Sequence, residues 1–181
     1  MTDAFALRLA TLADVAAIAA LQKASLAQLG AEFYAGEVLL AAVAHVSVVD
    51  RRLITDGTYF VACDGPVVVG CGGWSFRRKT FAGPGAADDA DDVVVPGRDA
   101  ARVRAMFVAP DRARSGIGAR ILAHCEQAAR AAGFDRVELG ATLSGEAFYL
   151  RHGYRERERI TSTLGDGTPF AVVMMTKSLT P

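Results

Sequence analysis

The spacing of apolar and polar positions along the chain alternates between the helical period and the strand period. Leu7–Leu9 has the pattern of a short strand, and Thr11–Asp14 has the spacing of a capping box that begins a helix through Leu26. A second helical stretch runs from about Gly36 to Leu53. These patterns predict one short strand followed by two helices.

Two β-rich runs at hairpin spacing follow, Tyr59–Cys63 and Val67–Trp74, with the turn Asp64-Gly65 between them. Val103–Val108 is the next predicted strand, and apolar positions recur at helical spacing from residue 117 to residue 133. The remaining predicted elements are a strand at 137–141, a short helix at 145–151 and a hairpin that pairs 155–163 with 170–176. The predicted order mixes α and β without an internal repeat.

The composition fits one compact domain over residues 1–181, because 51% of the 181 residues are apolar and supply a core. Twenty basic residues balance twenty acidic ones, so no overall field favours nucleic acid or an anionic membrane as a partner. The start, MTDAFALRLA, has no basic segment followed by an apolar run. We therefore expect a soluble, cytoplasmic protein that binds neither nucleic acid nor membrane.

The cysteines and histidines show no metal-binding or disulfide pattern. The three cysteines are an odd number without a CxxC pair, which indicates reduced core residues rather than a secreted disulfide framework. His124 and Cys125 are helix neighbours that point in different directions, and His45 and His152 lack metal-ligand spacing. We expect no metal site.

A long segment at 76–100 has neither period and carries Arg77, Arg78 and a cluster of aspartates. Loops of this length in compact domains are usually functional or disordered. Trp74, just before the segment, either lines a substrate pocket or packs in the core, and the basic run either attracts an acidic substrate or forms a solvated face. We expect residues 76–98 to set substrate selectivity.

The most informative segment is Arg104–Leu122, where a strand passes through a tight loop into a helix. Gly116 and Gly118 stand where the helix begins, so backbone N–H groups can approach an anion without obstruction by a Cβ atom. A pyrophosphate fits such a site, although a Gly-x-Gly pair can also simply make a tight connection. A Walker loop needs GK[ST], and a dinucleotide fingerprint needs a third glycine where this chain has Ile121.

Two motifs in this order resemble the GNAT superfamily of N-acetyltransferases. Val108-Ala109-Pro110 followed by residues 114–119 is similar to the family's acyl-CoA-binding motif, [RQ]-x-x-G-x-[GA], with Ala113 at the first motif position. Residues 148–154, Phe-Tyr-Leu-Arg-His-Gly-Tyr, resemble the family's closing FY…GF element. The asparagine common upstream of that tyrosine is replaced here by the segment Thr142-Leu143-Ser144.

The resemblance extends from Arg8 to about Lys177 and implies the fold. That fold is a single α/β (α+β) domain with a mixed, mostly antiparallel sheet of about seven strands, flanked by helices and splayed between its fourth and fifth strands. By the same resemblance, the splayed strand pairs with pantetheine through Met106, Phe107 and Val108, and a backbone N–H near Val108 steadies the oxyanion. The pyrophosphate is held by Arg114, Ser115, Gly116, Ile117, Gly118 and Ala119.

The implied activity is transfer of an acetyl group from acetyl-CoA to a primary amine, without a metal. Tyr149 is the implied general acid for the departing thiolate, although a buried tyrosine more often serves only the core. The general base stays open among Glu32, Glu37, Glu138 and the loop aspartates. The acceptor is a small-molecule or peptide amine, and a homodimer is possible. Two alternatives remain, a non-catalytic acyl-CoA sensor and an interaction module whose glycine loop holds another phosphate ligand.

Overall fold

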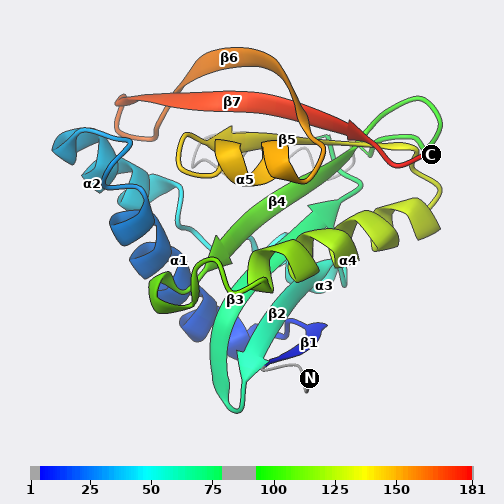
Figure 1. Cartoon of the computed structure of the whole chain (residues 1–181), viewed down its shortest axis with the longest axis horizontal. Coiled ribbons are helices and arrows are strands. Elements are labelled where there is room, and N and C mark those ends of the chain that lie inside the picture. Colours follow the sequence, from blue (N-terminus) through cyan, green and yellow to red (C-terminus); the bar gives the residue numbers. More distant parts are fainter. Residues whose placement is uncertain (1–4, 79–92, 181) are drawn as a thin grey trace.

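The computed structural model describes residues 5–78 and 93–180. Its strands form one seven-stranded sheet in the order β1-β2-β3-β4-β5-β7-β6 (Figure 1). Every pair is antiparallel except β4 and β5, which are parallel. This sheet confirms the predicted fold class. The strands are β1 (Ala6–Leu9), β2 (Tyr59–Asp64), β3 (Val67–Ser75), β4 (Ala101–Val108), β5 (Arg136–Thr142), β6 (Arg155–Thr163) and β7 (Pro169–Ser178).

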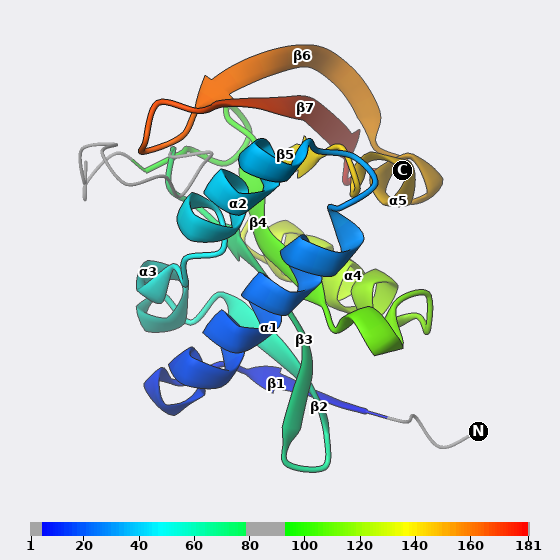
Figure 2. The same cartoon turned by 90° about the vertical axis from the view of Figure 1, so that its left-hand side faces the viewer.

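The helices cover both faces of the sheet (Figures 1 and 2). Because successive residues of β2 point to opposite faces, Phe60 and Ala62 pack in the core below α4, whereas Tyr59 and Val61 pack in the core below α1 and α3. A third cluster packs α1 and α2 against β7. The helices are α1 (Val15–Leu29), α2 (Gly36–His45), α3 (Arg51–Thr55), α4 (Ile117–Ala131) and α5 (Glu146–Arg151), with 3-10 turns η1 (Leu12–Asp14) and η2 (Pro110–Arg112).

The predicted single helix from Gly36 to Leu53 is wrong, because the chain forms two helices there. α2 ends at His45, and α3 begins at Arg51 after an extended residue, Asp50. The Asp50 side chain accepts a hydrogen bond from the backbone N–H of Arg52 at 3.1 Å, which is the role of an N-cap residue. The break lets Leu53 turn into the core below α1, while α2 stays against β7.

The sheet opens between β4 and β5. These strands pair only at Ala101 with Val137 and at Arg102 with Glu138, so the later part of β4 has no partner on its β5 side. A bulge accompanies the opening, because Arg104 lies opposite Gly73 and Phe107 lies opposite Cys71, which leaves one extra residue in β4. Ala105, at the bulge, has a φ of 53°. The predicted splay is thus present.

Two glycines of β3 bring α4 close to the sheet beside this opening. A Cβ atom on Gly70 would lie 2.5 Å from Cγ2 of Ile117, the first residue of α4. A Cβ atom on Gly72 would lie 2.7 Å from Cγ2 of Ile121, one turn further along α4. The missing side chains therefore let the start of α4 settle on β3 next to the gap.

None of the helices within residues 5–78 and 93–180 is long and apolar enough to cross a bilayer. Cys63, Cys71 and Cys125 are free thiols, and each is buried. Burial raises the pKa of Cys71 to about 12. The cysteines thus lie in the core, as their number and spacing predict.

Candidate active site

A cavity of about 900 Å³ occupies the opening between β4 and β5. Its lining comes from the end of α1, the connection between α2 and α3, the later part of β4, the start of α4, α5 and the turn between β6 and β7. Segments from the first and last parts of the chain therefore meet at one site. Eight of the predicted site residues line it, namely Met106, Phe107, Val108, Arg114, Gly116, Gly118, Ala119 and Tyr149.

Two predicted binding residues, Ser115 and Ile117, do not line the cavity. The Ser115 hydroxyl donates to the carbonyl of Arg112 at 2.6 Å, and the Ile117 side chain is buried in the core against β3. Any contact of these two residues with a cofactor would thus come from their backbone. Arg112 lies outside the lining too and forms an ion pair with Asp64 at 2.6 Å.

The start of α4 presents a run of backbone N–H groups at the cavity. Within the described part of the chain, the amides of residues 114–119 donate no hydrogen bond to another residue. Arg114 and Gly116 have φ values of 62° and 88°, and such left-handed residues turn successive amides toward one side. The helix dipole adds partial positive charge at this end, so the loop suits an anion such as a pyrophosphate.

The exposed edge of β4 adds backbone groups on the other side of the opening. Ala109 donates its N–H to the carbonyl of Val69 at 2.9 Å. Antiparallel pairs alternate between bonded and non-bonded positions, so Val108, which lies opposite Gly70, points its own N–H and C=O away from β3. These groups face the gap, where a carbonyl or amide of a ligand can pair with them.

Tyr149, on α5, faces the same cavity. Its side chain is buried, and its ring packs edge to face against Phe148 at 5.1 Å and Tyr154 at 5.5 Å. Its hydroxyl has no hydrogen-bond partner among the described residues, and the hydroxyl oxygen is not completely buried. Burial raises the pKa of Tyr149, with a further contribution from the Cys125 thiol. The phenol is therefore protonated at neutral pH and available as a donor.

Among the candidate general bases, the structure brings Glu32 to the cavity. Glu138 lies outside the lining and is held by ion pairs with Arg102 and Arg157. Glu37 is likewise outside the lining, and the loop aspartates at 88–92 lie outside the described residues.

The lining residues that sequence reasoning missed include three ionisable ones, Asp50, Arg104 and His45. Asp50 stands near the lining half of β4 although the two are more than fifty residues apart in sequence, and no local spacing signals such a meeting. In the sequence, Asp50 could be recognised only as a polar residue before a helix start. Such a residue indicates an N-cap and not a residue of an active site. His45 lies 3.6 Å from Asp166, which belongs to the turn between β6 and β7.

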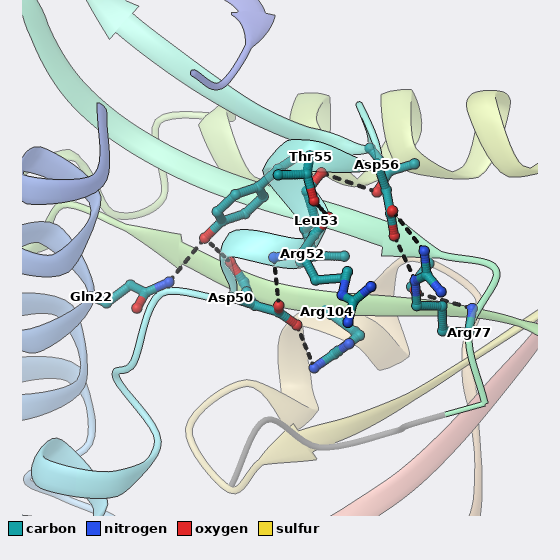
Figure 3. A network of polar contacts seen from close by, with 12 residues as sticks. Gln22, Asp50, Arg52, Leu53, Thr55, Asp56, Arg77 and Arg104 are labelled. Carbon is teal, nitrogen blue, oxygen red and sulfur yellow. Dashed lines mark hydrogen bonds and ion pairs between the residues drawn. The ribbon is translucent and has the colours of Figure 1, made fainter. Parts of the chain in front are cut away.

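Of the two interpretations of Trp74, core packing is the one observed, and Arg77 is likewise held away from the cavity. Trp74 packs in the core against Phe76 and Phe134, and Arg77 donates from Nε and Nη2 to Asp56 at 2.8 Å (Figure 3). Neither residue lines the cavity. Residues 79–92 of the long segment lie outside the described residues.

An open α/β sheet with an amide-rich helix start at its gap is the architecture of an acyl-CoA-binding acetyltransferase domain. The family model described as an acetyltransferase (GNAT) domain matches residues 55–156. The chain belongs to the GNAT family. A comparison with curated proteins gives no match.

Solved structures share the fold over nearly the whole chain. A GCN5-related N-acetyltransferase from Rhodopseudomonas palustris, also described as an aminotransferase of class II, is 24% identical, with a TM-score of 0.73 over 98% of each chain. The PaiA N-acetyltransferase from Thermoplasma acidophilum, solved with coenzyme A, is 13% identical, with a TM-score of 0.65 over 97% of this chain and 99% of that one. Ard1 from Thermoplasma volcanium is 15% identical, with a TM-score of 0.64 over 99% and 100%.

Proposed function

We propose that the protein transfers the acetyl group of acetyl-CoA to a primary amine by direct attack of the amine on the thioester. One observation carries the proposal: the free edge of β4, the amides at the start of α4 and the Tyr149 hydroxyl all face one cavity. The family membership and the coenzyme A in the PaiA structure support the choice of cosubstrate. The acceptor is a small-molecule or peptide amine. The enzyme acts in the cytoplasm.

The chain's own groups divide the work between binding and proton transfer. Amides of residues 114–119, with the Arg114 guanidinium, hold the pyrophosphate, and the edge of β4 at Met106–Val108 pairs with the pantetheine arm. The Val108 N–H faces the carbonyl oxygen that gains negative charge. Acetyl-CoA supplies the activated acyl group.

The reaction forms one bond, breaks one and moves protons at both nitrogen and sulfur. The nitrogen–carbon bond forms as the carbon–sulfur bond breaks, and Tyr149 donates a proton to the departing sulfur. The ammonium group loses one proton before it attacks, and the nitrogen loses a second as the amide forms. Glu32 and Asp50, which both line the cavity, can accept these protons directly or through water, and one of them returns to the Tyr149 phenolate through solvent.

The test is turnover of acetyl-CoA over a panel of monoamines, polyamines, amino acids and peptides, with released thiol and acetylated product measured together. We expect one acetylated amine for each thiol released. The protein's cysteines are buried, so they should add little to the thiol signal. Coenzyme A binding without turnover of any amine would indicate a sensor. Binding of a nucleotide but not of coenzyme A would indicate an interaction module.

A further inference from the structure

Arg104 is a buried cation in the wall of the cavity. It lies on β4 immediately before the bulge at Ala105, and its side chain is only 6% exposed. It nevertheless lines the cavity together with Asp50 and Glu32. A guanidinium stays charged in proteins, and placing a charge away from water is costly unless partners surround it.

The partners that this chain gives Arg104 are few. Its Nη2 lies 2.7 Å from Oδ2 of Asp50 (Figure 3), but Nη2 makes no properly oriented hydrogen bond and has no access to solvent. The other oxygen of Asp50 caps α3 through the N–H of Arg52. Burial lowers the pKa of Arg104 although Asp50 acts in the opposite direction. One carboxylate does not offset the burial of this cation.

The rest of the Arg104 guanidinium is not completely buried. Nε and Nη1 donate to no other residue in the described part of the chain, and each keeps some accessible surface. Because Arg104 lines the cavity, these two atoms are the donors that it can offer to an anion there. They lie on different edges of the guanidinium, so an anion meets each of them singly.

Arg77 shows how a structural arginine of this protein differs. Its Nε and Nη2 both donate to Asp56 at 2.8 Å, in a side-on bidentate pair away from the cavity (Figure 3). Arg102, two residues before Arg104, is held by Glu138 and does not line the cavity either. Arg104 alone of these three combines burial, a poorly oriented contact and access to the cavity.

The surroundings of Arg104 combine both charge types with apolar surface. Glu32 and Asp50 also line the cavity and supply negative charge, which suits an ammonium group. Leu29, Phe33 and Val48 line the cavity too and are large apolar residues left exposed, at 38%, 47% and 49%. Isolated exposed apolar residues are ordinary, but three at one cavity indicate an apolar ligand group.

We propose that the acceptor is an amino acid with an apolar side chain, whose carboxylate is bound by Arg104. This inference rests on the proposed acetyl transfer. The carboxylate meets the donors of Arg104, the amine lies toward the thioester within reach of the acidic groups, and the side chain packs on the apolar wall. An amine without the carboxylate would leave a buried guanidinium unsatisfied, and sites of this kind discriminate strongly against such analogues.

The experiment compares leucine with 3-methylbutylamine, which lacks only the carboxylate, and with leucinamide, which lacks only its charge. We expect kcat/KM for leucine to exceed that for either analogue by about 100-fold or more. Arg104→Gln should lower kcat/KM for leucine and bring the ratio of leucine to 3-methylbutylamine close to one. Phenylalanine and phenethylamine, which also differ only in the carboxylate, provide a second pair for the same comparison.

Arg77→Gln is the matched control, because it breaks a partly buried arginine–carboxylate pair outside the cavity. It should cost stability but leave the selectivity ratio unchanged. A ratio is insensitive to the fraction of folded enzyme, so a destabilised Arg104→Gln remains informative. If Arg104→Gln does not fold, Arg104→Lys, which keeps the charge but loses the planar guanidinium, should bring the ratio of leucine to 3-methylbutylamine part of the way toward one.

Equal use of leucine and 3-methylbutylamine by the wild type, or an unchanged ratio in Arg104→Gln, would overturn the inference while acetyl transfer stands. Failure of every amine to release thiol would instead remove the proposed function. In that case calorimetric titration of leucine and 3-methylbutylamine into the coenzyme A complex still decides the inference. Preference for leucine that Arg104→Gln abolishes would support it, and equal or absent binding would overturn it.

Discussion

At the scale of single residues, Tyr149 and Tyr154 have the same side chain and adjacent rings but different surroundings. Their ring centroids lie 5.5 Å apart, and burial raises the pKa of both phenols. Tyr149 lines the cavity, whereas the Tyr154 hydroxyl is completely buried and has no hydrogen-bond partner in the described residues. Access to the reacting atoms, rather than pKa, therefore distinguishes them.

Replacing Tyr149 with phenylalanine should lower kcat by about 10²- to 10⁴-fold, the usual contribution of general acid catalysis. The ring remains, so the affinity for acetyl-CoA should change little. Thiol release at saturating amine measures the first quantity, and calorimetry measures the second. Tyr154→Phe is the control and should keep turnover near the wild-type value. Equal turnover in the two variants would remove Tyr149 from the proposed mechanism.

The sequence predicts Tyr149 but not Arg104, and the difference has a physical cause. Tyr149 belongs to a local motif whose spacing is visible in one segment. The environment of Arg104 depends on Asp50, which comes from a distant segment, and on the bulge at Ala105. Alanine rarely adopts positive φ, so nothing in the local sequence marks that bulge.

At the scale of elements, the loop that begins α4 can be tested with a pair of glycines. Gly116 and Gly65 have φ values of 88° and 55°, and a Cβ atom at either would meet nothing within 4 Å. Alanine at either position should cost about 1–2 kcal/mol of unfolding free energy, because both need the left-handed conformation. Only Gly116→Ala places a methyl group at the cavity.

We therefore expect Gly116→Ala to weaken coenzyme A binding by at least about tenfold and Gly65→Ala to leave it unchanged. Thermal unfolding and calorimetric titration of both variants provide the measurements. If both variants bind coenzyme A with wild-type affinity and equal loss of stability, the amides at the start of α4 are not the pyrophosphate site.

The link between β1 and η1 should make part of the stability depend on pH. Asp14 pairs with Arg8 at 2.7 Å and accepts from the Thr11 N–H at 2.7 Å, and these contacts hold the pKa of Asp14 below its ordinary value. A lowered pKa in the folded state means that the stabilisation is present above the unfolded pKa of about 4 and is lost as the pH falls further.

Asp14→Asn should lower the unfolding free energy by up to about 1 kcal/mol at pH 7, since half of Arg8 is exposed to solvent. In a protein of this length that is about 2–4 °C in Tm. The difference from the wild type should shrink toward pH 2. Asp111, whose side chain is 80% exposed, gives the control variant Asp111→Asn. A difference that persists undiminished at pH 2 would contradict the assignment.

The hydrophobic period predicts which helices and strands exist better than it predicts the residues at which they begin and end. The capping box at Thr11–Asp14 and the hairpin of β2 and β3 are where the sequence predicts them. The break between α2 and α3 was missed because apolar residues continue through Val46–Val49 without a glycine or proline. The two helices are separated by the packing of Leu53, which is a tertiary feature, and by the Asp50 cap, which is a local signal that the predicted continuous helix overlooked.

At the scale of the whole molecule, the proposed function divides the lining of the cavity into a cofactor side and an acceptor side. We assign the start of α4 and α5 to the first, and the end of α1, the α2–α3 connection and the β6–β7 turn to the second. The sequence predicts that residues 76–98 set selectivity, because that segment is long and aperiodic. The structure anchors its start through Trp74 in the core and through the Arg77–Asp56 pair, and residues 79–92 lie outside the described part of the chain. Hydrophobic period and segment length do not indicate which other loops meet at the opening.

Phe33 tests this division, because it lines the acceptor side and is 47% exposed in the protein without an acceptor. Phe33→Ala removes apolar surface that a bound acceptor would cover, worth about 1–2 kcal/mol. The KM for the amine should thus rise by roughly 5- to 30-fold, whereas the dissociation constant of coenzyme A should stay the same. Leu40→Ala is the control, since Leu40 is 73% exposed and does not line the cavity. Initial rates over an amine titration and calorimetry with coenzyme A measure the two constants. Weakened coenzyme A binding with an unchanged amine KM would place Phe33 on the cofactor side and reverse the division.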